Sequence, residues 1–165
     1  TQGAMRNGTK ASYRSVWSEP MSQGTRCRQL AEYVVFESPL NMLCDTPVNY
    51  IKEQECTDFI TSIPTVWAET IVIDGKIGAY ETIARQAYDG DWYVGSLAGW
   101  EGRDAVLDLS FLGVGEYEAE IFRDGVNAGR NANDYKHLTL SVSRPDKLRI
   151  RVAPGGGYVI RFKKK

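Results

Sequence analysis

The stretch VWAETIVIDGKIGAYETIARQAYDGDWYVGSLAGW, residues 66 to 100, decides the fold class of this chain. It contains three short runs rich in β-branched and aromatic residues, which are separated by Asp74-Gly75 and by Asp89-Gly90. Asp-Gly between such runs is a strong hairpin signal, because both residues tolerate the positive φ angles of tight turns. We therefore predict antiparallel strands with a turn at each pair.

The same pattern continues to the C-terminus. A third Asp-Gly pair stands at Asp124-Gly125, and apolar residues alternate with polar ones before it, as at Tyr117, Ala119 and Ile121. About eight short strands at spacings of roughly 8–12 residues are typical of an antiparallel β-sandwich. We predict such a sandwich over residues 65–165. The expected strands beyond residue 100 are 104–112, 116–125, 137–143, 147–153 and 157–163.

The residues upstream have a different pattern. Apolar positions three and four apart indicate a helix from about Thr25, which ends before Pro39. The run LNMLCD, residues 40–45, is typical of a buried parallel strand, and residues 48–63 favour a second helix. Helix, strand, helix is the repeat of a (β/α)8 barrel, although a closed barrel takes about 250 residues. We therefore predict a mainly β chain with a small α/β segment, in which residues 1–64 are the C-terminal remnant of such a barrel.

Composition argues against several classes of function. The formal net charge is -1, which gives no indication of a nucleic-acid or membrane-surface partner. No apolar run approaches the roughly 20 residues of a membrane span. The cysteines, Cys27, Cys44 and Cys56, are odd in number and lack CxxC spacing, so neither a disulfide framework nor a zinc site is expected. His137 is the only histidine and no nucleophile motif accompanies it, which argues against a catalytic triad.

Several longer motifs together carry a resemblance to a known family. They are GAMRN (3–7), EPMSQGTRCRQLAEYVVFESPLNMLCDTPVNYIKEQECTDFI (19–60), IPTVWAET (63–70), DWYVGS (91–96), FRDGVNA (122–128) and APGGGY (153–158). Over essentially its whole length the chain resembles the C-terminal part of the glycoside hydrolase family 97 enzymes, which are α-glucosidases and α-galactosidases. In that family a catalytic (β/α)8 barrel is followed by a smaller β-sandwich. The resemblance implies the end of the barrel plus that sandwich.

The resemblance also carries expectations about chemistry. Glycoside hydrolysis needs two carboxyl groups, one on each side of the scissile bond. The catalytic and calcium-binding glutamates of the family lie upstream of the GAM motif and correspond to no residue of this chain. No catalytic residue and no metal ligand is therefore expected here, and calcium belongs to the parent enzyme. The family further implies a periplasmic protein.

Two residues are candidates for lining the sugar pocket of the parent enzyme. Asp45 ends the predicted strand at the face where barrel active sites are built. The alternative for Asp45 is a helix N-cap or a structural hydrogen bond ahead of Pro47. Gln23 lies in a loop before the first helix and could reach a sugar hydroxyl. Glu53 and Glu55 are interpreted as solvated residues at the start of a helix.

Two further groups have a functional and a structural interpretation. Trp67, Trp92 and Trp100 could form a platform that stacks on sugar rings, but tryptophans in alternating strands are more typical of a core. Residues 124–134 are rich in Asp and Asn, whose oxygens suit calcium. Their spacing is not that of an EF-hand loop, so Asx turns are the favoured interpretation.

We therefore interpret the chain as a non-catalytic C-terminal fragment of a family 97 α-glycosidase, whose sandwich supports the barrel. Its partners would be the missing part of the barrel and, through the parent enzyme, a carbohydrate substrate. One alternative is a carbohydrate-binding or structural module, for which an exposed coplanar aromatic pair would be the sign. The other is self-association through the apolar residues of segment 25–63, since exposed apolar patches mark interaction sites.

Overall fold

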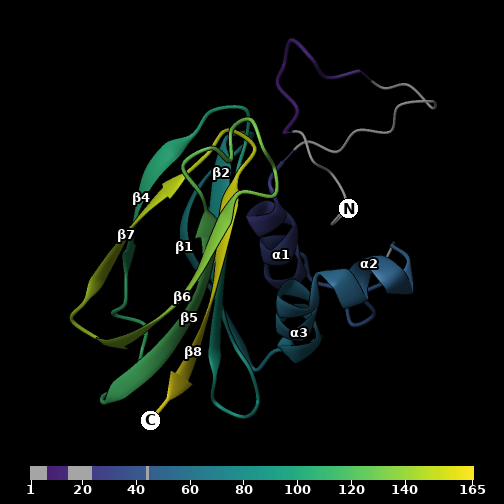
Figure 1. The fold of residues 1–165 in the computed structure, drawn as a ribbon. Helices are drawn as coiled ribbons and strands as arrows, with labels where there is room; N and C mark the ends of the chain where they lie inside the picture. The colour runs from purple at the N-terminus through teal and green to yellow at the C-terminus, as the bar shows by residue number, and fades with distance from the viewer. Residues whose placement is uncertain (1–6, 15–23, 44) are drawn as a thin grey trace.

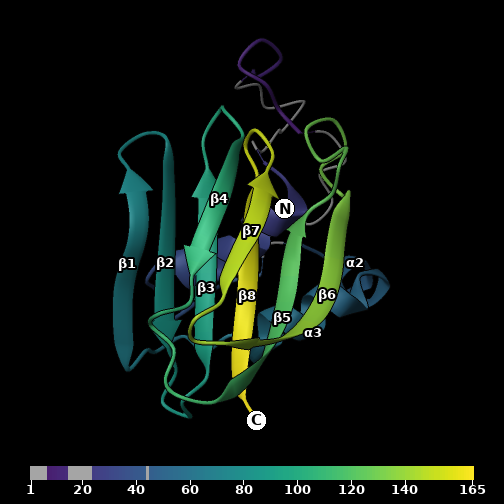
Figure 2. The same ribbon diagram turned by 90° about the vertical axis from the view of Figure 1, so that its left-hand side faces the viewer.

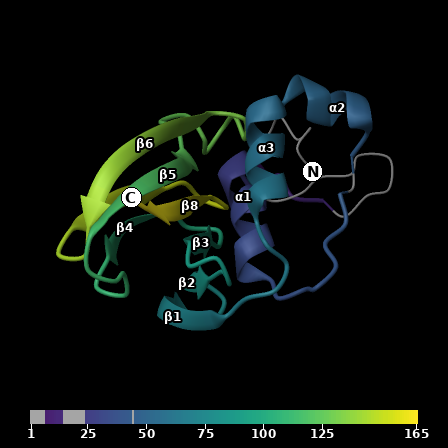
Figure 3. The ribbon, with the colours of Figure 1, turned by 90° about the horizontal axis from the view of Figure 1, so that it is seen from below.

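The computed structural model describes residues 7–14, 24–43 and 45–165, and these form three layers (Figure 1). Helices α1 (Arg26–Val35) and α3 (Gln54–Ser62) cover one face of a six-stranded sheet, and a two-stranded sheet lies on the other face. The short helix α2 (Pro47–Lys52) projects away from the sheet (Figure 3). None of the helices in these residues is long and apolar enough to span a membrane.

The six-stranded sheet has the order β1-β2-β3-β8-β5-β6, and each neighbouring pair is antiparallel. The C-terminal strand β8 therefore lies in the centre of the sheet, between β3 and β5 (Figure 2). The strands are β1 (Glu69–Lys76), β2 (Tyr80–Gln86), β3 (Trp92–Ala98), β5 (Glu116–Asp124), β6 (Tyr135–Ser143) and β8 (Gly157–Lys164).

The smaller sheet consists of β4 (Arg103–Asp108) and β7 (Lys147–Val152), which pair antiparallel. Alternate residues of these strands, such as Leu107 and Ile150, are buried against inward-facing residues of the large sheet, such as Ile121. The main core lies between the two sheets, as the alternating pattern predicts for a sandwich. The predicted antiparallel sandwich and its strands are thus confirmed.

A second core lies between the large sheet and the helices. Helix α1 approaches β3 closely at Gly95, where an added Cβ would lie 2.9 Å from the carbonyl oxygen of Ala31 and 3.0 Å from Cβ of Val34. Because both of its faces are covered, every residue of β3 is buried. The helix predicted from about Thr25 is confirmed as α1, and its apolar residues Leu30, Ala31, Val34 and Val35 are buried. The second core includes Cys27, Leu30, Ala31, Val34, Val35, Cys56, Phe59, Ile60, Ile83, Tyr93, Phe122 and Val159.

Only part of the turn prediction is confirmed. Asp89-Gly90 lies in the turn between β2 and β3, where Gly90 has a φ of 95°. The turn predicted at Asp74-Gly75 is wrong, because both residues pair with β2 inside β1. The chain reverses further on, over residues 77–79, and Gly78 supplies the positive φ of 76°. A glycine without a preceding Asp thus meets the conformational need of this turn.

The strand predicted at residues 40–45 is absent from the described positions 40–43 and 45. Leu40 and Met42 are 76% and 75% exposed. A strand needs a neighbour for its backbone hydrogen bonds, and no strand pairs with this segment in the described part of the chain. The helix predicted over 48–63 is two helices, because Glu53 leaves the helical conformation with φ -111° and ψ 45°. The assignment of residues 1–64 to a barrel stays a prediction.

Candidate functional site

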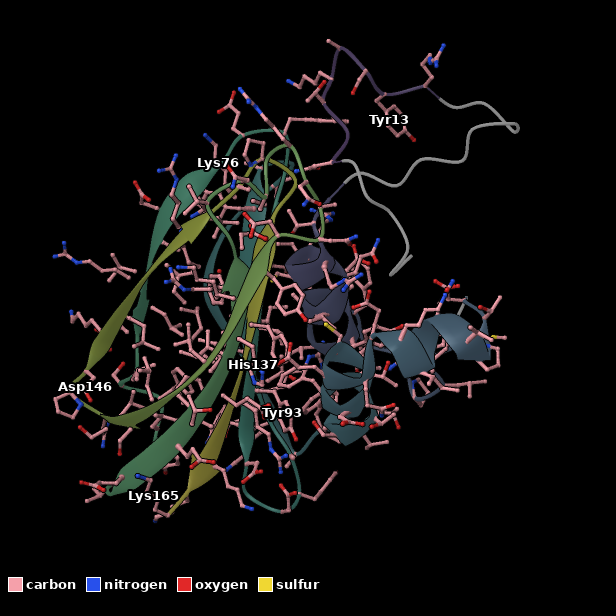
Figure 4. All side chains as sticks on the ribbon, viewed as in Figure 1. Tyr13, Lys76, Tyr93, His137, Asp146 and Lys165 are labelled. Atoms are coloured by element: carbon pink, nitrogen blue, oxygen red, sulfur yellow. The ribbon has the colours of Figure 1, made fainter. Side chains whose placement is uncertain are left out.

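A cluster of polar side chains joins α3 to the edge of the large sheet. One carboxylate oxygen of Glu55 accepts a hydrogen bond from the Tyr135 hydroxyl at 2.6 Å, and the other lies 2.7 Å from Nδ1 of His137. The second ring nitrogen of His137 lies 3.0 Å from a carboxylate oxygen of Glu120 on β5. Figure 4 places His137 between the sheet and the helices. The imidazole thus bridges carboxylates on two different elements.

The electrostatics of this cluster favour a structural role. The hydrogen bonds from Tyr135 and His137 lower the pKa of Glu55, so its carboxylate stays charged. Burial, followed by the hydrogen bond to Glu55, raises the pKa of Tyr135, so its hydroxyl remains a donor. The His137 ring also stacks on Phe122, with ring centroids 4.0 Å apart. Since both ring nitrogens are already engaged, the cluster holds the helix in place and offers no unengaged imidazole nitrogen for proton transfer.

Two further hydrogen bonds join the large sheet to the ends of the helices. The Tyr93 hydroxyl donates to the carbonyl oxygen of Ser62 at 2.9 Å. Nη2 of Arg85 donates to the carbonyl oxygen of Val35 at 3.1 Å. These carbonyls stand at the C-terminal ends of α3 and α1, where the last carbonyls of a helix lack N–H donors from within the helix. Side chains of the sheet therefore cap both helices and fix their position on it.

An exposed apolar segment follows α1 and continues through α2. We name residues 36–51 the apolar segment. Helix α2 within it contributes no buried residue. Apolar side chains gathered on a surface in this way mark sites of interaction with another protein surface. The large apolar side chains of this segment that are 45–76% exposed are Phe36, Leu40, Met42, Leu43, Val48 and Ile51.

Asp45 lies within the apolar segment, directly before α2. Its Oδ1 accepts hydrogen bonds from the backbone nitrogen of Thr46 and from Nδ2 of Asn49, both at 2.7 Å. These bonds, that from Asn49 first, lower the pKa of Asp45. The N-cap of α2 is Thr46 and not Asp45. Asp45 instead makes structural hydrogen bonds one residue before the cap, as the alternative interpretation expects. Gln23, the other candidate for sugar binding, lies outside the described residues.

The three tryptophans that could form a sugar platform or belong to a core lie in three separate places. Trp92 is buried and meets Phe111 edge-on. Trp67 packs edge-on against Tyr93 in the second core. Trp100 meets Tyr13 at an interplanar angle of 71°. None of these three pairs is coplanar, which disfavours a stacking platform built on them.

The Asp- and Asn-rich loop after β5 contains an Asx turn, in which Oδ1 of Asn131 accepts from the backbone nitrogen of Asn133. Across the loop, Oδ2 of Asp134 accepts from the backbone nitrogen of Asn127. These side-chain oxygens therefore satisfy the loop's own backbone. Across residues 7–14, 24–43 and 45–165, no group of His, Cys, Asp and Glu is suited to hold a metal ion. The calcium implied by the family resemblance finds no fitting set of ligands among these residues.

Two sheets packed face to face, with helices on the outer face of the larger sheet, define a β-sandwich domain. The chain belongs to glycoside hydrolase family 97: residues 66–163 match the family model described as glycosyl-hydrolase 97 C-terminal, oligomerisation. A retaining alpha-galactosidase of Bacteroides thetaiotaomicron is 56% identical over 163 residues, which are 99% of this chain and 24% of that protein. The chain thus spans about a quarter of the length of this relative.

Solved structures show the same relationship. A family 97 enzyme from Pseudoalteromonas sp. strain K8, in complex with acarbose, matches with a TM-score of 0.83 and 37% identity. The match covers 86% of this chain and 23% of that enzyme. A beta-arabinopyranosidase matches with a TM-score of 0.70 and 27% identity, over 84% of this chain and 21% of that one. The predicted resemblance to family 97 is confirmed.

The site residues that sequence reasoning missed are Glu55 and Glu53. The sequence pattern indicates a solvated helix start at both positions, but Glu55 binds Tyr135 and His137, and Glu53 forms an ion pair with Arg26. Glu55 and His137 are 82 positions apart in the chain, so no local pattern joins them. The helical periodicity that places Phe59 and Ile60 against the sheet was the one available signal that α3 packs on another element.

Proposed function

We propose that this chain is the non-catalytic C-terminal region of an α-glycosidase that hydrolyses α-galactosides or α-glucosides. The similarity to a retaining alpha-galactosidase along 99% of the chain supports this class of enzyme. On this proposal residues 1–64 are the end of the catalytic barrel. The acid–base carboxylates and the calcium site belong to the rest of the protein, which acts in the periplasm.

Asp45 and Gln23 would lie at the sugar-facing rim of that barrel. Both hydrogen bonds that the structure gives the Asp45 side chain use Oδ1, which leaves Oδ2 to accept from a sugar hydroxyl. Glycoside hydrolysis needs a carboxyl on each side of the scissile bond, and on this proposal both belong to the part of the enzyme outside this chain. The chain's turnover of p-nitrophenyl α-galactoside and α-glucoside should therefore be zero. Turnover by this chain alone would refute the non-catalytic assignment.

Self-association is a second proposed role, and the exposed apolar segment, which precedes the sandwich in the sequence, is the observation that carries it. The description of the matching family model includes oligomerisation, which supports self-association of the chain, although the matched residues 66–163 begin after the apolar segment. Leu40 and Ile51 are 76% and 69% exposed, which is unfavourable unless another surface covers them. A second copy of the chain would bury these side chains in an apolar contact.

Sedimentation velocity over a range of concentrations tests this proposal. The unchanged chain should form dimers or larger species, and Ile51→Ser should shift it toward monomer. Val114→Ser is the matched control, because Val114 is 82% exposed but lies between β4 and β5, away from the apolar segment. A chain that stays monomeric at high concentration would contradict self-association. The same substitution should also be made in a longer protein that includes the barrel. If Ile51→Ser leaves the oligomeric state of that longer protein unchanged, the barrel and not a second copy covers the apolar segment.

A further inference from the structure

A cavity of about 620 Å³ opens at one end of the sandwich, far from the apolar segment in the sequence. It lies where β5 passes into the loop before β6 and where β4 begins and β7 ends. In Figure 2 these strand ends lie together at the upper end of the sandwich. Charged side chains dominate its lining. They are Arg103, Asp104, Arg123, Asp124, Lys136 and Arg151.

The cavity is unusual in that two like charges lie directly opposite each other in its lining. Arg123 on β5 and Lys136 on β6 are direct partners in the antiparallel register. Directly opposed residues share one face of the sheet, and like charges in that position repel. Neither side chain forms a hydrogen bond or an ion pair with the residues that the structure describes. An anion bound between the two side chains would relieve this repulsion.

The acidic residues of the lining do not neutralise this pair. Asp124 follows Arg123 on the strand and so points to the opposite face of the sheet. There its Oδ2 accepts from the backbone nitrogens of Ala153 and Gly157, at 2.9 and 3.1 Å. Asp104 is the register partner of Arg151 on the smaller sheet, yet the two form no ion pair. Arg123 and Lys136 on the large sheet thus line the cavity together with Arg151 of β7, which lies on the outer face of the smaller sheet.

Arg103 has a different role in the lining. Its Nη2 forms an ion pair with Asp74 at 2.7 Å, and its guanidinium lies 3.6 Å above the ring of Tyr80. It is therefore already held by the β1–β2 hairpin and contributes little charge to the cavity. The residues left to bind a ligand are Arg123, Lys136 and Arg151.

We propose that this cavity binds an oxyanion, which is a carboxylate, phosphate or sulfate group. Arg123 would form a bidentate pair with two of its oxygens, since a guanidinium matches oxyanion geometry. Lys136 would supply a point charge from the neighbouring strand, and Arg151 would close the site from the smaller sheet. The bound anion removes the repulsion between Arg123 and Lys136. A volume of about 620 Å³ admits the anion together with the sugar ring of an acidic saccharide.

Calorimetric titration of the chain at low ionic strength tests this site. The probes are inorganic phosphate, sulfate and D-galacturonate, with D-galactose as the neutral match of the last. We expect the anions to bind and galactose not to bind. Tighter binding of galacturonate than of phosphate would identify an acidic sugar as the natural source of the anion, and the reverse order would identify a free inorganic ion.

Three variants locate the site. Arg123→Gln and Lys136→Gln should each weaken anion binding by about tenfold, the loss of one charge-assisted contact. Arg149→Gln removes the same charge from β7 but outside the cavity, and it should leave the affinity unchanged. Equal losses in all three variants would show that net charge alone attracts the anion, which overturns the site. The absence of binding by every anion, or equal binding of galactose, would overturn it as well.

Discussion

Replacing Gly95 with alanine tests the contact that joins α1 to the sheet. The new Cβ would lie 2.9 Å from the carbonyl oxygen of Ala31, 2.9 Å from Cγ2 of Val35 and 3.0 Å from Cβ of Val34. The first and last of these atoms belong to the backbone or to the base of a side chain, so no change of rotamer relieves them. The helix itself must move, and overpacking of this kind costs about 1–3 kcal/mol.

Thermal unfolding followed by circular dichroism measures this cost. For a chain of this size about 1 kcal/mol corresponds to about 2–4 °C in Tm, so a cost of about 1–3 kcal/mol should make Gly95→Ala unfold roughly 2–12 °C below the unchanged protein. Gly75→Ala is the control, because its Cβ would lie 3.7 Å from the nearest atom, the carbonyl oxygen of Tyr80. That change should leave Tm unaltered or raise it slightly, through the lower entropy of the unfolded chain. Equal melting temperatures for the two variants would refute the close packing of α1 on β3.

Three further predictions concern charged groups. Glu55→Gln should cost about 1 kcal/mol of unfolding free energy at neutral pH. Because the fold lowers the pKa of Glu55, this difference should shrink as pH falls below about 4.3, the value of an unfolded glutamate, and a constant difference in urea unfolding down to pH 3 would contradict the cause. Burial raises the pKa of Asp124 to about 6, so the free energy of unfolding should fall by about 3 kcal/mol as pH rises from about 4 to 6. Asp124→Asn should remove this pH dependence in the same urea-unfolding assay. Lys136→Gln should raise unfolding free energy by about 0.5 kcal/mol without ligand, because it ends the repulsion with Arg123, and a loss of stability would count against that repulsion.

The strands could be predicted because alternation records the two faces of a sheet directly. In β4 and β5, residues such as Leu107 and Ile121 alternate with charged ones, and the structure buries the apolar set. The turn at residues 77–79 could not be placed in this way. Asp74-Gly75 carries the stronger turn signal, but the pairing of β1 with β2 extends past it.

The helices could be predicted from their apolar face, but their packing partner could not. The periodicity of α1 shows that Leu30 and Val34 are buried, and it contains no information about which surface covers them. The structure shows that the sheet covers them, through β3 and β8. The run at 40–45 has the composition of a buried strand, yet its described residues are exposed, because composition alone does not supply a neighbouring strand.

The candidate site was beyond local sequence reasoning for the same reason. The contact between Glu55 and His137 depends on α3 lying beside β6, which is a tertiary arrangement. The like-charge pair of Arg123 and Lys136 depends on the register of two strands separated by a loop of ten residues, 125–134. Such pairs become visible only once the register is known.

Because β3 is covered on both faces, the sandwich depends on the two helices that precede it in the sequence. The family match begins at residue 66, after both helices. A sandwich inherited from that point would present Ile83, Tyr93 and Val159 to water, and these are large side chains that α1 and α3 now shield. A gene fusion that moves the sandwich into another protein should therefore give a well-folded domain only when it includes α1 and α3. The unit that is inherited thus extends beyond the two sheets.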